Sequence, residues 1–161
     1  MRSLVAYYSR SGNTRFVAET IADFLDAEVE EIIDKSDRSG PIGWIKSGIQ
    51  ATMEVDTEIE ELEYSPSNYD LVVLGSPVWN KRITPAMRTY LKEPNFYNSE
   101  IAFLNTNKSD KTQNTFDTMK DLLGGKEPIS TLVLSKVLEN KKESEKRIEK
   151  WCREIKSQMI E

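Results

Sequence analysis

The sequence predicts an α/β fold, a three-layer doubly wound domain built on a five-stranded parallel sheet. Continuous apolar runs of strand length alternate along the chain with segments whose apolar residues recur at helical spacing. Most of these runs lack the apolar–polar alternation of a half-exposed strand, so helices are expected on both faces of the sheet. The 161 residues contain no repeat, low-complexity tract or composition break, and we therefore expect a single domain over residues 1–161.

Five segments have the character of strands. Residues 4–8 (LVAYY), 70–74 (DLVVL) and 101–106 (IAFLNT) are largely apolar, as is typical of buried parallel strands. Residues 29–33 (VEEII) are charged as well as apolar, which is typical of an edge strand. Residues 130–135 (STLVLS) supply the last strand. Because helical segments separate them, right-handed crossovers and a parallel sheet are expected.

Five helices are expected between and after these strands. The first begins near Thr14 and places Val17, Ile21 and Leu25 on one face. Residues 40–53 depart from the simple alternation, and we interpret them as a short helix with an irregular approach. The other helices are expected at 84–92, at 116–123 (where Gly124 and Gly125 end the helix) and at 141–159.

Composition excludes several classes of function. The net charge of −5 and the pI of about 5.0 argue against a nucleic-acid surface. The chain has no histidine and one cysteine, Cys152, which excludes an internal disulfide and catalysis by Ser-His-Asp or Cys-His groups. It also argues against a zinc or other transition-metal site. We therefore expect no catalytic side chain and no metal, and reactive chemistry supplied by an organic cofactor. Cys152 lies on the apolar stripe of the last helix and is expected to be a buried structural thiol.

The location of the protein is also an expectation from composition. The amino terminus, MRSLVAYY, is too short for the apolar core of a signal peptide, and no apolar run approaches the roughly 20 residues that span a bilayer. A lone cysteine suits a reducing compartment. These features predict a soluble cytoplasmic protein that contacts no membrane.

A polar turn, SRSGNT at residues 9–14, joins the first strand to the first helix. Ser9, Ser11 and Thr14 offer hydroxyl donors, Gly12 permits positive φ, and the helix begins with unpaired N–H groups. Such a cradle suits a phosphate at the positive end of the helix dipole. The turn lacks the lysine of a P-loop and the glycines of a dinucleotide fingerprint, so a single terminal phosphate is favoured. The alternative is an ordinary turn in which Thr14 is only an N-cap.

Two further segments end neighbouring strands at the same edge of the sheet. In residues 75–82 (GSPVWNKR), Trp79 is expected in a loop, where it either stacks on a flat ring or anchors a helix. Residues 105–111 (NTNKSDK) form a polar loop. A phosphate cradle beside an aromatic loop describes a site for a flat heterocycle with one phosphate, and FMN has that form.

With these motifs, the sequence resembles the flavodoxin family. SRSGNT resembles the family's phosphate loop, LVVLGSPVWNKRITPAMRTYL its second flavin loop with the helix after it, and IAFLNTN its third loop. The resemblance covers nearly the whole chain and implies the strand order 2-1-3-4-5. It also implies a cofactor-binding set: Ser9, Arg10, Ser11, Gly12, Asn13 and Thr14 at the phosphate; Pro77, Val78, Trp79 and Asn80 at the ring and ribityl chain; and Thr106, Asn107 and Lys108 at the polar edge of the ring.

The chain departs from the family pattern around the presumed ring. The tyrosine and the acidic cluster of many flavodoxins are not found in the third loop beyond Asp110, while Lys81, Arg82, Lys108 and Lys111 lie nearby in sequence. Positive charge favours the anionic reduced flavin. We therefore expect a less negative potential for the last electron than an acid-ringed flavodoxin has.

Three functions remain open from the sequence. The first is an FMN protein that passes electrons between redox partner proteins or to a small acceptor. The second is an FMN-dependent NAD(P)H:quinone-type oxidoreductase, in which Trp44 or Trp79 borders the space over the ring. The third is a flavodoxin-shaped interaction module without flavin. Trp44 either closes the ligand site or packs locally, and the sequence does not determine the oligomeric state.

Overall fold

The architecture is that of a computed structural model, which describes residues 1–36, 39–93, 95–108 and 114–160. The strands are β1 (Ser3–Tyr7), β2 (Glu28–Glu31), β3 (Leu71–Trp79), β4 (Arg82–Ile83), β5 (Glu100–Asn107) and β6 (Ser130–Ser135). The helices are α1 (Asn13–Leu25), α2 (Gly40–Thr52), α3 (Pro85–Lys92), α4 (Thr115–Leu122) and α5 (Lys141–Gln158), with short 3-10 turns η1 (Pro66–Asn68) and η2 (Val137–Glu139).

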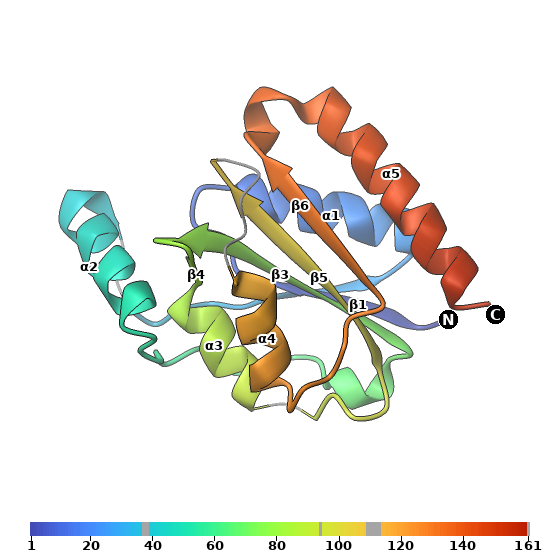
Figure 1. Ribbon diagram of the computed structural model, residues 1–161, viewed down its shortest axis with the longest axis horizontal. Coiled ribbons are helices and arrows are strands. Elements are labelled where there is room, and N and C mark those ends of the chain that lie inside the picture. Colours follow the sequence, from blue (N-terminus) through green and yellow to red (C-terminus); the bar gives the residue numbers. More distant parts are fainter. Residues whose placement is uncertain (37–38, 94, 109–113, 161) are drawn as a thin grey trace.

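The sheet has the order β2-β1-β3-β5-β6, and these five strands are parallel. Counting the parallel strands alone, this is the predicted order 2-1-3-4-5, with the charged strand β2 at an edge as expected. Helices α1 and α5 cover one face of the sheet, and α3 and α4 cover the other (Figure 1). The fold class is therefore the predicted α/β, doubly wound arrangement.

The buried strands divide their side chains between two cores. In β1, Val5 and Tyr7 pack on the side of α1 and α5, whereas Leu4 and Ala6 pack on the side of α3 and α4. All four are nearly or completely buried. This division explains why β1 is a continuous apolar run, because successive side chains of a strand point to opposite faces and both faces are covered.

The prediction of a loop after residue 74 is wrong. Strand β3 continues through Trp79, and β4 returns antiparallel to it, pairing Val78 with Ile83 and Trp79 with Arg82. Asn80 and Lys81 form the two-residue turn between them, with φ of 45° and 66°. Positive φ at both central positions is the geometry that matches the twist of a tight hairpin. The sheet thus has a sixth, short strand that the sequence analysis did not predict.

Cys152 lies in the core that α5 shares with α1, as predicted. Its side chain is 1% exposed, and burial raises the pKa of its thiol to about 12. The neighbouring Trp151 is also buried and donates its indole N–H to Ser130 Oγ at 2.7 Å. Because the thiol stays protonated near neutral pH, Cys152 acts as an apolar core side chain.

Helix α2 lies apart from the two helical layers, beside the β3–β4 hairpin (Figure 1). Its buried residues are the small ones, Gly43, Ser47 and Ala51. Among the described residues, no helix combines the length and the apolar character that crossing a bilayer would require.

Candidate functional site

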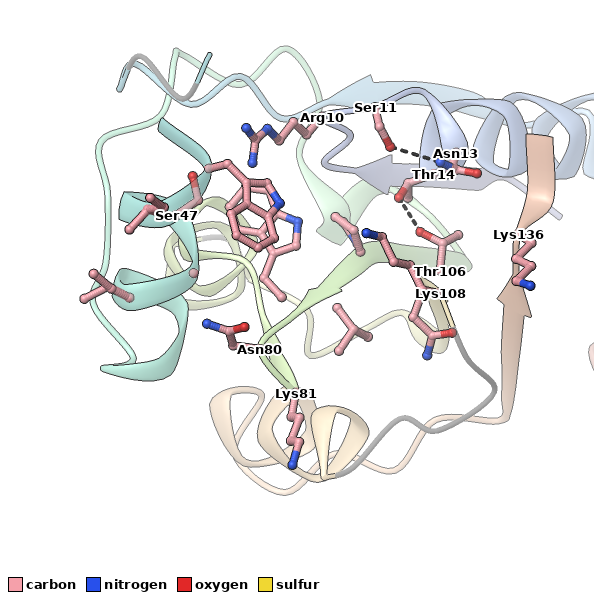
Figure 2. A pocket seen from close by; sticks show the side chains of 18 of the residues that line it. Arg10, Ser11, Asn13, Thr14, Ser47, Asn80, Lys81, Thr106, Lys108 and Lys136 are labelled. Carbon is pink, nitrogen blue, oxygen red and sulfur yellow. Dashed lines mark hydrogen bonds between the residues drawn. The ribbon is translucent and has the colours of Figure 1, made fainter. Parts of the chain in front are cut away.

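A cavity of about 880 Å³ opens at the carboxyl ends of the central strands. The β1–α1 loop, helix α2, the β3–β4 hairpin, the end of β5 and the segment after β6 all contribute to it (Figure 2). Its place is the edge at which doubly wound sheets bind ligands, next to the point where the strand order reverses. Every predicted site residue except Ser9 and Gly12 lines it: Arg10, Ser11, Asn13, Thr14, Pro77, Val78, Trp79, Asn80, Thr106, Asn107 and Lys108.

Ser9 and Gly12 belong to the turn that precedes α1, but they do not line the cavity. Gly12 is the N-cap of α1 and has φ of 92°, a left-handed conformation that glycine adopts without strain. Its N–H donates to Ser9 Oγ at 3.2 Å. The place of these two residues at a phosphate therefore stays a prediction, and the turn that they form leads to the cavity wall at Asn13 and Thr14.

The amino end of α1 has no side-chain cap among the described residues. Helix α3 shows the contrast, since Thr84 Oγ1 accepts a hydrogen bond from the N–H of Met87 at its first turn. The first-turn N–H groups of α1 lack intrahelical partners and lie beside Ser11, Asn13 and Thr14 of the cavity wall. They form the kind of donor set that binds an anion at the positive end of a helix dipole.

Thr14 is not the N-cap of α1, which is Gly12, so the alternative that Thr14 serves only as an N-cap is wrong. It lies inside α1, and its hydroxyl is 2.8 Å from that of Thr106 at the end of β5, with both side chains nearly buried. Beside this contact, a Cβ on Gly75 would lie 3.2 Å from both Leu104 Cδ2 and Tyr7 Cβ, so glycine fits the close packing of β3 between β1 and β5. The hydrogen bond between Thr14 and Thr106 thus joins the segments that the sequence analysis predicted as the first and third loops.

Trp79 of the hairpin lines the cavity and contacts two residues that precede α1. Its ring meets that of Tyr8 edge-on, with centroids 5.5 Å apart and an interplanar angle of 82°. The Arg10 guanidinium lies 5.8 Å from the Trp79 ring centroid, and Figure 2 shows Arg10 extending from the first loop toward α2. Trp79 therefore both packs against the core and borders the cavity, which combines the two roles that the sequence left open.

Helix α2 and the segment after β6 contribute residues that the sequence analysis did not include. From α2, the lining comprises Trp44, Ile45, Ser47, Gly48 and Ile49. Trp44 was expected either to close the ligand site or to pack locally, and it borders the cavity with 62% of its surface exposed. The helical spacing of residues 45 and 49 was visible in the sequence, but this spacing does not indicate that the helix borders a ligand cavity.

Lys136 and Glu139 reach the cavity through contacts with the first loop. Asn13 Nδ2 donates to Ser11 Oγ at 3.0 Å, and Asn13 Oδ1 accepts the N–H of Leu138 at 3.2 Å. This second bond ties the segment after β6 to the β1–α1 loop. Lys136 and Glu139 of this segment thus line the same cavity as the first loop, and the sequence analysis named neither.

The basic residues expected near the presumed flavin ring do not all line the cavity. Lys81 and Lys108 line the cavity. Arg82 does not, and its Nε lies 3.7 Å from Glu54 Oε1. Lys111 and Asp110 lie outside the described residues.

Comparisons with known proteins agree with this geometry. A search of curated protein sequences found no match. Among solved structures, the chain is similar to a protein of Bacteroides uniformis described as a flavoprotein (18% identity, 94% of this chain and 97% of that one, TM-score 0.81). It is also similar to a Lactobacillus acidophilus flavoprotein in complex with FMN (26% identity, 88% and 97%, TM-score 0.70) and to a Fusobacterium nucleatum flavodoxin bound to flavin mononucleotide (12% identity, 98% and 99%, TM-score 0.61).

A family model provides the decisive match. The model described as flavodoxin matches residues 2–155, which include every described residue of the cavity wall. The match thus extends over nearly the whole chain, and the sheet order and the place of the cavity agree with it. The chain belongs to the flavodoxin family.

Proposed function

We propose that the chain binds FMN in this cavity and transfers electrons in the cytoplasm, to redox partner proteins or to a small acceptor. The proposal rests on one observation: two features that suit FMN occur in the same cavity. The uncapped amino end of α1 supplies anion-binding donors, and Trp79 supplies an aromatic wall of the same cavity. The similar flavoprotein and flavodoxin that contain FMN support the same ligand.

Residues of three segments would hold the cofactor. Ser11, Asn13 and Thr14, with the first-turn N–H groups of α1, suit the phosphate, and Lys136 adds positive charge to the same cavity. Pro77, Val78, Trp79 and Asn80 suit the ring and ribityl chain, and Thr106, Asn107 and Lys108 suit the polar edge of the ring. FMN would supply the redox chemistry, while the chain binds it, covers part of its surface and sets the charge around it.

Comparison of FMN with riboflavin tests the phosphate cradle. We expect purified protein to bind FMN, with visible flavin absorbance, and to bind riboflavin at least about tenfold more weakly because the phosphate contacts are missing. Ser11→Asp should lower FMN affinity by a similar factor, since it places a carboxylate beside the phosphate.

The matched control is Ser65→Asp. Ser65 is exposed and precedes η1, which leads into the amino end of β3, at the opposite edge of the sheet. FMN affinity should be unchanged in this variant. Failure of FMN to bind would contradict the proposal and leave the flavin-free module. Equal affinities for FMN and riboflavin would contradict the phosphate cradle.

Lys81 and Lys108 support a proposal about the reduction potential. Because both residues line the cavity, their positive charges should favour the anionic reduced flavin. Changing both residues to Gln should make the last potential more negative, by an amount on the order of 1 kcal/mol of interaction free energy. Potentiometric titration of the FMN-loaded proteins measures this shift, and an unchanged or less negative potential would contradict it.

A further inference from the structure

Helix α2 has an inverted pattern of burial. Its buried residues are the small ones, Gly43, Ser47 and Ala51, whereas its large apolar side chains are exposed. Four of these are Ile42, Ile45, Ile49 and, at the C-cap, Met53, with 82%, 55%, 53% and 69% of their surface exposed. A helix that serves only to cover a core buries its large apolar side chains. The outward face of α2 therefore needs another explanation.

These four side chains, which we call the α2 stripe, follow one line along the helix. They are spaced three, four and four residues apart, and at about 100° per residue this spacing confines them to an arc of about 80°. The small buried residues lie on the other side of the helix by the same spacing. Apolar residues three and four apart are typical of a helix that packs lengthwise against a second helix.

The proposed FMN site does not account for the whole stripe. Ile45 and Ile49 line the cavity, but Ile42 and Met53, the two most exposed members, do not. The elements that α2 mainly contacts are β3, β4 and α3. For the described part of the chain, Figure 1 shows α2 at one end of the molecule with no helix or strand on its outer side. A ligand in the cavity would therefore leave much of the stripe uncovered.

The area of the stripe is sufficient for a weak protein–protein interface. From the exposed fractions, it presents on the order of 500 Å² of surface, and an apolar patch of this size often marks an interaction site. Two copies of the stripe placed face to face would bury on the order of 1,000 Å², which is the lower limit for a specific interface. Such an area suits a reversible dimer with a Kd in the micromolar range.

Charges of opposite sign lie toward the two ends of the stripe. Lys46 is exposed in the amino-terminal half of α2, and Glu54 and Asp56 are about half exposed just beyond its carboxyl end. An antiparallel pair of α2 helices brings Lys46 of each copy toward Glu54 of the other, and it also opposes the two helix dipoles favourably. Since Glu54 already lies 3.9 Å from Arg88 of its own chain, the new pairing affects orientation more than affinity.

We propose that the α2 stripe is the interface of a homodimer in which the two α2 helices pack antiparallel across a two-fold axis at Ile49. Ile49 then meets Ile49 of the second copy, and Ile45 meets Met53. A two-fold interface uses the same surface of both copies, so one self-complementary stripe is enough. Burial of apolar surface supplies the affinity. The dimer does not depend on FMN, and it can hold or fail separately from the proposed function.

Sedimentation velocity of the full chain at increasing concentration, with and without FMN, tests the dimer. We expect wild type to pass from monomer to dimer in the micromolar range under both conditions. Ile42→Glu and Met53→Glu each place a carboxylate in the stripe of both copies, and neither residue lines the cavity. Each variant should weaken association at least about tenfold, because an unpaired charge would be buried in the interface. Circular dichroism should show both variants folded as wild type is, since both side chains are exposed.

The matched control is Ile160→Glu. Ile160 is 86% exposed, close to the 82% of Ile42. It follows α5, whose carboxyl end lies at the opposite side of the molecule from α2 (Figure 1). The same change of charge at this position should leave association within about twofold of wild type.

Disulfide trapping tests the position of the two-fold axis. Cys152 is the one cysteine of the chain and is 1% exposed, so Ile49→Cys would introduce the only accessible thiol. Oxidation with copper phenanthroline should link two copies of this variant through residue 49. The matched variant Ile160→Cys should form linked dimers at least about tenfold more slowly, because it has no contact across the proposed interface.

Several outcomes would overturn the proposal. Wild type that stays monomeric at every concentration would do so, as would an equal loss of association in Ile160→Glu. Flotation of monomeric protein with vesicles of phosphatidylcholine and phosphatidylglycerol would assign the stripe to a membrane surface instead. Equal cross-linking of Ile49→Cys and Ile160→Cys would contradict the antiparallel arrangement. If the dimer forms but FMN does not bind, only the proposed function fails.

Discussion

Helices α1 and α2 have the same length, 13 residues, and opposite relations to the core. Helix α1 buries Val17, Ile21 and Leu25 against the sheet. Helix α2 buries only Gly43, Ser47 and Ala51. The first helix is therefore fixed by apolar packing and can hold a polar turn rigidly at its amino end. The second contributes little apolar burial to the fold, and its large side chains remain available to the cavity.

Charged contacts hold the carboxyl end of α2 in place of apolar ones. Glu54, just beyond the helix, lies within 3.9 Å of Arg82 and Arg88, and Asp56 lies 3.5 Å from Arg88 and 2.6 Å from Lys92. The carboxylates are about half exposed, so each pair contributes modestly to stability. The comparison predicts that substitutions in α1 change stability, whereas equivalent substitutions in α2 change the site.

The largest expected difference is between isoleucines of the two helices. Ile21→Ala removes a completely buried side chain and should lower the free energy of unfolding by about 2–5 kcal/mol. Ile49→Ala removes a side chain that is 53% exposed and should change it by no more than about 0.5 kcal/mol. Urea denaturation of both variants measures the two values. Similar losses would show that α2 belongs to the core as α1 does.

A smaller difference is expected between threonines of the two helices. Thr14→Val leaves the buried hydroxyl of Thr106 without its partner and should lower the free energy of unfolding by about 1–3 kcal/mol. Thr52→Val removes a bond from an exposed hydroxyl to the carbonyl of Gly48, and its effect should be below about 0.5 kcal/mol. The same denaturation experiment applies. A neutral Thr14→Val would argue against a structural link between the first and third loops.

The smallest effect concerns the contact between α2 and the hairpin. Gly48→Ala improves helix propensity by about 1 kcal/mol but moves the Asn80 side chain, which lies 2.8 Å from the new Cβ. With Asn80→Gly in place, the full gain should appear, so a double-mutant cycle should give a coupling of about 0.5–1 kcal/mol. Additive effects would mean that α2 does not rest on the hairpin turn.

The polar turn and the hairpin differ in how well local sequence predicts them. The turn SRSGNT predicted the loop before α1 because Gly12 meets a local demand for positive φ. The hairpin was missed because Lys81, with φ of 66°, has no such preference and is held there by the pairing of β3 with β4. The sequence also did not show that Arg82 pairs with Glu54 and does not line the cavity, because Glu54 is distant in sequence.

By itself, the sequence determined the fold class, the five parallel strands with their helices, the buried thiol of Cys152 and three of the segments that meet at the cavity. These follow from local patterns of apolar residues, whose burial drives folding and whose spacing distinguishes a helix from a strand. Only the tertiary structure decided that α2 walls the cavity, that Lys136 and Glu139 join it and that Thr14 bonds Thr106. Those features depend on contacts between residues far apart in sequence. Uncharged side chains occur on both faces of α2, so its sequence does not show which face the fold will cover.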